Sequence, residues 1–384
     1  MKECNLSPDG NVVFVDEEGF SRAKNTFIRV PAFYFKRTVQ DGVEEWLISG
    51  YPHEGFLPEP WFVNADGTVS PYRYIAKYEG CAFENGEVSV SGKTPQRFLS
   101  IEQFQKGCAD AGFSLCSIYA YLAIQHLFVI ECGTTDAQAI NSGVSFVPYS
   151  SLELCLVKNS ECSNTAILPY HWRWETVEPG TVLYISTAVA GDLSTPRKLL
   201  SMRREGELLY LELDGEPFSF EANVTRVFAS AYPTGGCDAM QYVNGRLSAN
   251  QHTCPFLYRG IENIYGNAWE LMDGIGYDSD AQHVLLDHQP LSFITPANHA
   301  LGEAGTGFIA RLGLDPERPW ATFPCELGAS ERSHYRAEWS TFGKERHAVA
   351  FGGGWDHFFC NSIFCMRTIS HHLGNWLYGY RAMK

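Results

Sequence analysis

The residues with the clearest chemical potential lie near the C-terminus, in the stretch 351-FGGGWDHFFCNSIFCMR-367. Two cysteines there are separated by four residues and have histidines on either side, in the series His357, Cys360, Cys365, His371 and His372. Thiolate and imidazole groups are ligands that zinc or copper would take. The spacing is looser than in a structural zinc knuckle. Buried free cysteines are therefore the simpler interpretation, and metal binding is the alternative.

Other catalytic patterns are missing from the sequence. It has no G-x-S-x-G elbow, no P-loop and no G-x-G-x-x-G between a strand and a helix. The glycines at 352–354 precede Trp355 rather than a helix, so phosphate binding is not expected. Acidic pairs such as Glu262/Glu270 and Asp273/Asp278 are interpreted as turn and cap residues. The sequence therefore singles out no catalytic residue, and we expect no cofactor.

Composition excludes several classes of protein. The 384 residues carry a formal net charge of −15, which disfavours binding to nucleic acid or to an anionic membrane. The N-terminal residues include acids where a signal peptide would need an apolar run, and no stretch has the 18–20 apolar residues of a membrane span. We expect synthesis in the cytoplasm without a signal peptide. The 12 cysteines should then be reduced core residues.

The first 99 residues are predicted to form antiparallel strands. Apolar and β-branched runs such as 26-TFIRVPAFYF-35 and 45-EWLIS-49 alternate with turn signals. The turn signals are Asp9-Gly10, Asp41-Gly42, Asp66-Gly67 and Asn85-Gly86.

Two helices are predicted next. Ser100 and Gln103 fit a capping box ahead of 101-IEQFQKGCADAG-112, and the apolar run 117-SIYAYLAIQHLFVIE-131 contains no Gly or Pro. The second helix should be buried against the sheet. His126 is therefore predicted to be a core histidine rather than a ligand.

The texture of the chain changes twice after the helices. Strand-like runs at 181–189, 208–215 and 223–230 predict a β-rich insertion. From about residue 251, regular periodicity fades while Gly, Trp, Tyr and His become dense. Gly266-Asn267 predicts a tight turn there, ahead of a core strand that includes Trp269. We predict an α+β chain in three parts, with N-terminal strands and helices at 1–147, the insertion at 148–250 and a C-terminal half at 251–384.

The tail has an unusual composition. Between Gly353 and Arg381 there is no Lys, Glu or Gln, whereas Phe, His, Asn, Ser, Ile, Tyr and Trp are frequent. Aromatic anchors mixed with short polar groups are typical of antibody-like binding surfaces. A buried core is the alternative, but the polar side chains are too many to bury unpaired. We therefore predict a partly exposed face.

Three stretches carry a resemblance to a known family: 258-YRGIENIYGNAWELMDG-274, 351-FGGGWDHFFCNSIFCMR-367 and 374-GNWLYGYRAMK-384. They resemble the C-type lectin fold of the sulfatase-modifying, formylglycine-generating-enzyme superfamily, with its GN-x-WEW-like strand, GGSW segment and closing GFR or GYR. Leu271 departs from the pattern, where a second Trp is usual. The resemblance implies a C-type lectin fold with short antiparallel strands, two helices and long loops, plus the β-rich insertion. It implies the framework residues Trp269, Gly353, Gly354, Trp355, Gly379 and Arg381.

The similarity is greater to the phage and prophage proteins of this fold, including the variable proteins of diversity-generating retroelements. Their early motifs match 30-VPAFYFKR-37, 46-WLISGYPHEGFLPEPWF-62 and 124-IQHLFVIECGTTDAQ-138. In such proteins adenine-containing codons of the C-terminal block, commonly Asn codons, are rewritten. Randomising the first two bases of an Asn codon ending in C never yields Lys, Glu or Gln. The residue types missing from the tail fit this pattern.

The resemblance implies a display protein that binds a host cell-surface or other macromolecular ligand, without nucleic acid and without membrane insertion. Trimeric assembly is common among phage receptor-binding proteins, although no heptads here demand it. One alternative is a tail or capsid protein that binds no ligand, in which the side chains of this C-terminal block would be buried. Another is a formylglycine-generating copper oxidase that uses Cys360 and Cys365. The short segment from Cys365 to Tyr380 disfavours that reading. The implied variable, ligand-binding face is Asp356, His357, Phe358, Phe359, Asn361, Ile363, Arg367, Ile369, His371, His372, Asn375 and Tyr378.

Overall fold

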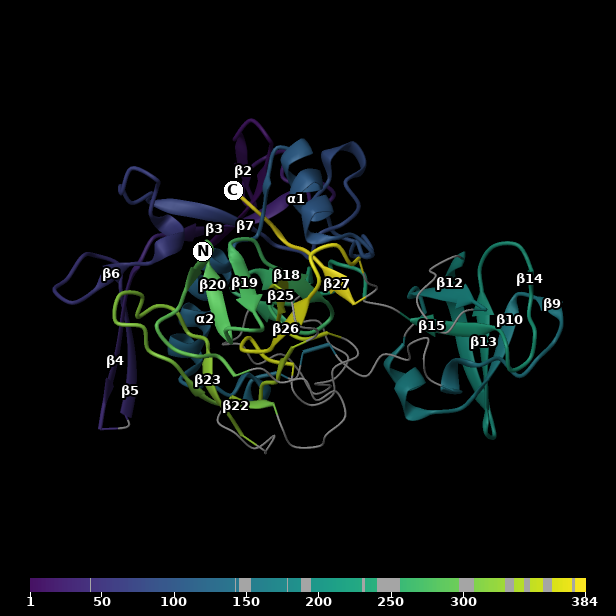
Figure 1. The fold of residues 1–384 in the computed structure, drawn as a ribbon. Coiled ribbons are helices and arrows are strands. Elements are labelled where there is room, and N and C mark those ends of the chain that lie inside the picture. The colour runs from purple at the N-terminus through teal and green to yellow at the C-terminus, as the bar shows by residue number, and fades with distance from the viewer. Residues whose placement is uncertain are drawn as a thin grey trace.

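The computed structural model describes residues 1–41, 43–141, 143–144, 153–177, 179–187, 195–229, 232–239, 256–296, 307–328, 335–341, 346–354, 361–374 and 377–384. Within these residues the chain is mostly β, with several antiparallel sheets and two α-helices (Figure 1). The predicted α+β class is confirmed at this level.

A six-stranded sheet joins the two ends of the chain. Its order is β2 (Val12–Phe14), β1 (Lys2–Leu6), β3 (Thr26–Pro31), β7 (Tyr72–Ala76), β28 (Ala382–Met383) and β8 (Ser114–Leu115). β28 pairs antiparallel with both β7 and β8, so the closing strand is inserted among strands from the N-terminal part. The last residues of the chain thereby complete a sheet that the first residues begin.

A second, three-stranded ribbon projects from this region in Figure 1. It consists of β4 (Tyr34–Gln40), β5 (Val43–Ser49) and β6 (Leu57–Pro58). Asp41, with φ of 53°, begins the two-residue connection predicted from Asp41-Gly42. The run predicted as one strand at 26–35 is divided instead, because β3 ends at Pro31 and β4 begins only at Tyr34. Proline has no N–H to continue a ladder.

The two predicted helices are confirmed as α1 (Ile101–Asp110) and α2 (Ile118–Cys132). The Ser100 side chain accepts from the Gln103 N–H and the Gln103 side chain accepts from the Ser100 N–H, which completes the capping box. Gly133 ends α2 in the left-handed region, with φ of 64°. α2 is apolar on nearly every side and lies within the main core. His126 is fully buried in it, as predicted.

An eight-stranded sheet is built almost entirely from the C-terminal half. Its strands are β21 (Gln289–Pro290), β20 (His283–Leu286), β19 (Ile275–Asp278), β25 (Arg346–Phe351), β18 (Trp269–Leu271) and β27 (Tyr378–Gly379), with β24 (Trp339–Ser340) and β26 (Met366–Ile369) beside them. β25 is the centre, since it pairs with β18, β19 and β26. The predicted turn before β18 is also present, because Gly266 and Asn267 have φ of 78° and 59°.

Shorter elements complete the chain. They are the pairs β16 (Leu257–Tyr258) with β17 (Ile261–Glu262) and β22 (Phe308–Leu312) with β23 (Pro324–Gly328), and the 3-10 turns η1 (Pro60–Phe62), η2 (Glu84–Gly86), η3 (Ala137–Ala139), η4 (Glu153–Cys155) and η5 (Trp172–Thr176). Two of the 3-10 turns, η4 and η5, belong to the β-rich segment.

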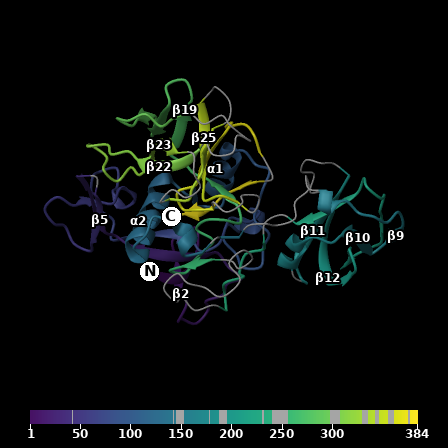
Figure 2. The ribbon, with the colours of Figure 1, turned by 90° about the horizontal axis from the view of Figure 1, so that it is seen from below.

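The β-rich segment between the two halves has a hydrophobic cluster of its own (Figures 1 and 2). Its five-stranded sheet has the order β10 (Thr165–Pro169), β13 (Leu208–Leu213), β12 (Thr195–Glu205), β11 (Val182–Ser186) and β15 (Arg226–Ala229), with β9 (Cys162–Ser163) and β14 (Phe218–Ser219) as a separate pair. The predicted boundaries near residues 148 and 250 lie outside the described residues, so they remain predictions.

Candidate functional site

The predicted variable face is only partly within the described residues. Asp356, His357, Phe358, Phe359 and Asn375 lie outside them, as do Trp355 and Cys360. The remaining seven positions can be located. They are Asn361, Ile363, Arg367, Ile369, His371, His372 and Tyr378.

Five of these seven positions are buried, so the prediction that they are exposed is wrong. They are Asn361, Ile363, Arg367, Ile369 and Tyr378, with exposed fractions between 0% and 7%. The physical reason is the sheet. Residues 366–369 form β26, which lies between β25 and β24, and Tyr378 lies in β27 beside β18.

The buried polar residues of this group find partners inside the protein. The Asn361 amide donates to the carbonyl oxygen of Val144 at 3.0 Å. The Arg367 guanidinium lies 4.4 Å from the ring centroid of Trp269, and its Nε donates to Ser340 at 3.2 Å. The number of polar residues in the tail is therefore a poor guide to its exposure, because these buried side chains find hydrogen-bond partners in the sheet and in neighbouring residues.

The predicted framework positions that are described are all buried. Trp269 in β18 is completely inaccessible, and Gly353, Gly354, Gly379 and Arg381 are also inside. Gly353 has φ of 79°, and a Cβ there would lie 2.1 Å from Asn361 Oδ1. Only glycine fits that position without displacing a neighbour.

Of the cysteine pair proposed for copper, only Cys365 is described, and it is buried in a cluster of apolar side chains. Within the described residues, no three His, Cys, Asp or Glu side chains are grouped so that they could hold a metal ion. The Cys360/Cys365 alternative therefore stays a prediction.

The C-terminal block returns to the surface after β26. His371 is partly exposed, and the His372 side chain is 84% exposed. Both imidazoles follow the strand directly and lie close to the first turn of α1, where His372 Nδ1 is 3.5 Å from Glu102 Oε1. Of the predicted face residues that are described, these two are the ones that a macromolecular ligand could reach.

His371 borders a cavity of about 410 Å³. Its walls come from α1, from the β19–β20 hairpin and its following turn, and from β25. Three carboxylates (Glu102, Asp273 and Asp287) and three imidazoles (His288, His347 and His371) line it. The rest of the lining is Gln105, Gly274, Gly276 and the apolar side chains of Ile101, Ile275 and Leu285. Pockets of this size, with apolar walls and a few convergent polar groups, are typical of ligand sites.

Local hydrogen bonds fix the carboxylates of this cavity. Gln105 Nε2 donates to Asp273 Oδ1 at 2.8 Å, and the Tyr119 hydroxyl donates to Asp287. Asp287 and His288 form the two-residue turn between β20 and β21, with φ of 46° and 67°. Left-handed backbone at two non-glycine residues is unusual, and Asp and His are among the side chains that tolerate it best.

No pattern in the sequence points directly to this cavity. Asp273 was interpreted as a turn residue, and its carboxylate does accept the Gly274 N–H at 2.9 Å. Glu102 and Gln105 are on α1, some 170 residues earlier in the chain. The available signal was Asp287-His288 between two strand-like runs, which matches a hairpin turn.

The interpretation of the other acidic residues was right in part. Asp278 accepts from the N–H groups of Asp280 and Ala281, as a turn residue does. Glu270 contradicts it, because this side chain is 4% exposed and forms a buried ion pair with Arg381.

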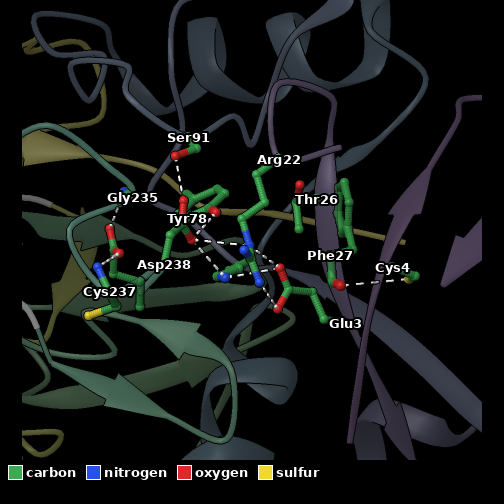
Figure 3. Close-up of polar contacts among 12 residues, drawn as sticks. Glu3, Cys4, Arg22, Thr26, Phe27, Tyr78, Ser91, Gly235, Cys237 and Asp238 are labelled. Carbon is green, nitrogen blue, oxygen red and sulfur yellow. Dashed lines mark hydrogen bonds and ion pairs between the residues drawn. The ribbon is translucent and has the colours of Figure 1, made fainter. Parts of the chain in front are cut away.

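A second group of charged residues lies between the N-terminal strands and the segment 234–238 (Figure 3). Lys77 Nζ is 2.9 Å from both Glu3 Oε1 and Asp238 Oδ1, and Arg22 Nε is 2.8 Å from Glu3. Tyr78 and Ser91 donate to Asp238 at 2.5 and 2.6 Å. Both carboxylates of this cluster, Glu3 and Asp238, are paired with a cation, so the cluster connects the N-terminal strands to the segment 234–238.

The electrostatics of this cluster agree with that role. Burial disfavours ionised Asp238, but the hydrogen bonds from Ser91, Tyr78 and Lys77 outweigh it and hold the pKa of that carboxyl below its usual value. Glu262 lies beside it and accepts from the N–H groups of Gly235 and Cys237 at 2.9 Å. Burial raises the pKa of Glu262 despite these two bonds.

No protein-family model matches the chain, and a search of curated proteins finds no match. The resemblance to the C-type lectin fold therefore rests on the motifs quoted above. Among the described residues, no helix is long and apolar enough to cross a membrane.

Proposed function

We propose that this chain is a ligand-binding display protein of phage or prophage origin, with a C-type lectin fold whose C-terminal block is diversified by a retroelement. The observation that carries the proposal is the path of this block. The segment that lacks Lys, Glu and Gln is anchored in the eight-stranded sheet and reaches the surface at His371 and His372, beside a cavity.

The architecture supports the lectin-like part of the proposal. Two helices and many short antiparallel strands are what the resemblance implies. The chain ends share one sheet, and the motif residues Trp269, Gly353 and Arg381 lie in the core.

The same arrangement explains how recognition could change without loss of the fold. Exposed substitutions away from caps and cores typically change the free energy of unfolding by no more than about 0.5 kcal/mol. His371 and His372 satisfy that condition, whereas Arg367 and Ile369 do not, because they are packed inside the sheet. The binding surface proposed here therefore consists of the turn at 371–374 and the adjoining cavity, together with the predicted positions Asp356, His357, Phe358, Phe359 and Asn375.

Binding to whole bacterial cells tests the proposal. Fluorescently labelled protein is applied to a panel of bacterial strains and measured by flow cytometry. We expect strain-dependent binding that is lost in a His371→Ala, His372→Ala double variant and kept in His53→Ala, an exposed histidine in the loop after β5. Equal binding by the parent and the double variant would contradict the proposal that His371 and His372 belong to the binding surface.

The retroelement part has its own test. The DNA flanking the coding sequence should contain a near-copy of the segment for residues 353–381 and a reverse transcriptase. Asn codons are expected in that copy at the varied positions. If both are missing, the retroelement claim fails and the binding claim stands.

A further inference from the structure

The cavity bordered by His371 has an unusual charge balance. Three carboxylates line it, from Glu102, Asp273 and Asp287, and its lining contains no Lys or Arg. The hydrogen-bond donors that reach Asp273 and Asp287 are neutral, namely the Gln105 amide, the Gly274 N–H and the Tyr119 hydroxyl. In the described part of the chain, Asp273 and Asp287 thus accept hydrogen bonds from neutral donors and form no ion pair with Lys or Arg, while the imidazoles of His288, His347 and His371 line the same cavity.

Several partly buried acidic groups elsewhere in the described part of the chain have a fixed cation beside them. Glu131, Asp136 and Asp315 each pair with an arginine, and Glu3 and Asp238 share Lys77 and Arg22. Among the same described residues, neither Asp273 nor Asp287 has an ion pair, and the ion pair of Glu102 is with His372 at 3.5 Å.

From this we infer that the cavity receives a cationic group, an ammonium or a guanidinium, presented by the ligand of the proposed binding function, on which this inference rests. Ile101, Ile275 and Leu285 in the lining offer an apolar surface to the methylene stem of such a group. A lysine or arginine side chain has this combination of apolar stem and charged head. The net charge of −15 of the whole chain would also favour the approach of a basic partner.

The positions of the carboxylates suit a convergent clamp. Asp273 follows β18, Glu102 is in the first turn of α1, and Asp287 begins the turn after β20, so three separate elements supply one charge each. Gly274 and Gly276 add no side chain to the wall, in which Ile275 lies between them. The cavity can therefore admit a charged head toward Asp273 while its rim stays acidic.

The test uses the full chain and three short probes: acetyl-Lys-Lys-Lys-amide, acetyl-Glu-Glu-Glu-amide and 1,5-diaminopentane, each titrated by calorimetry at low salt. We expect the lysine peptide to bind and the glutamate peptide not to bind. Binding should weaken about threefold in Asp273→Asn or Asp287→Asn and about tenfold in the double variant. Asparagine keeps the hydrogen bond from Gln105, and it tolerates the left-handed backbone at position 287.

Asp110→Asn is the matched control, because Asp110 is an exposed acid at the other end of α1 and pairs with Lys106 outside the cavity. This variant should bind the lysine peptide as the parent does. Equal binding by the parent and the double variant would overturn the inference, as would equal binding of the glutamate peptide. Thermal unfolding of each variant checks that the fold is retained.

The diamine separates the two sources of a cation. Competition by 1,5-diaminopentane shows that an isolated ammonium fills the cavity, whereas binding of the peptide alone shows that a basic polypeptide is needed. If no cation binds while cell binding still depends on His371 and His372, the cation inference fails and the proposed function stands. If the lysine peptide binds through Asp273 and Asp287 but no cell binding is found, the cation inference stands and the proposed function fails.

Discussion

The guanidinium of Arg381 donates two hydrogen bonds to Glu270 Oε1, from Nη2 at 2.6 Å and from Nε at 3.0 Å. It also donates to four carbonyl oxygens, those of Ala76, Lys77, Glu262 and Asn263. Ala76 ends β7 in the first sheet, whereas Glu270 is in β18 of the eight-stranded sheet. One buried side chain therefore joins the two sheets at the closing motif of the chain.

Removing this side chain should be among the most damaging single changes. Arg381→Met leaves the Glu270 charge buried without its cation and removes one donor from each of the four carbonyls, and we expect a loss of about 3–5 kcal/mol in the free energy of unfolding. Arg381→Lys should also lose most of it, because one ammonium cannot reproduce the planar fork. Urea unfolding measures both. Arg311→Met, which removes an exposed pair with Glu326, is the control and should change little.

A pH-dependent contribution to stability is expected from Glu79. Burial raises the pKa of this carboxyl to about 8, against the opposing pull of the Arg97 guanidinium. Below pH 4.5 the side chain is protonated in both states. As the pH rises toward 8, the unfolded chain releases the proton that the folded chain keeps, so folding stability from this group is lost across that window.

Glu79→Gln should remove that loss. A glutamine can still accept the hydrogen bond that Asn267 donates to Glu79, without a charge to bury. We expect the variant to be more stable than the parent by about 2 kcal/mol at pH 8, with the difference shrinking toward pH 4.5. Urea unfolding at pH 5, 6.5 and 8 checks this, with exposed Glu45→Gln as control. A difference that does not vary with pH would contradict it.

Elements with strong local signals could be predicted from the sequence. The capping box of Ser100 and Gln103, the apolar run of α2 and the Asp41-Gly42 turn all depend on neighbours within a few residues, and the structure contains each of them. The core position of His126 followed from the same run.

Exposure in the C-terminal block could not be predicted in this way. Whether Arg367 faces solvent depends on β24 and β25 on either side of β26, and on Trp269, about 100 residues earlier. The cavity shows the same limit, since Gln105 meets Asp273 only after α1 has packed against the later sheet. Short strands with weak periodicity carry little information on which face is buried.

The glycine at position 353 should resist substitution more than an ordinary turn glycine. Gly353→Ala places a Cβ in left-handed backbone and against Asn361, whose amide also holds Val144. Gly67→Ala is the matched control, because its φ of 81° is similar but nothing lies within 4 Å of its added Cβ. We expect a cost of about 1 kcal/mol for Gly67→Ala and at least about twice that for Gly353→Ala, measured by thermal unfolding. Equal destabilisation by the two substitutions would contradict this, because it would show that the Asn361 side chain moves aside without loss of stability.

The β-rich insertion should be removable without loss of the surrounding fold. Leu156 and Arg226 form an antiparallel bridge at its base, and the Val157 N–H donates to the Thr225 carbonyl at 3.0 Å. The two strands that enter and leave the insertion are therefore adjacent, and a short Gly-Ser linker can replace residues 157–225. Excision removes most of the core of the insertion, but Val144, Cys155, the β15 residues 227–229 and the half-buried Leu377 belong to the same cluster and stay in the shortened chain.

We expect the shortened chain to unfold cooperatively and to keep the Tm of the surrounding fold within a few degrees, because its two main hydrophobic clusters contain no residue of the excised segment. Replacing Leu377 by Ser in the shortened chain removes one of the apolar side chains that excision exposes, with the parent chain carrying the same substitution as control. Circular dichroism and calorimetry measure the outcome. Aggregation of both shortened chains, or a transition without cooperativity, would mean that the insertion is needed for the fold around it.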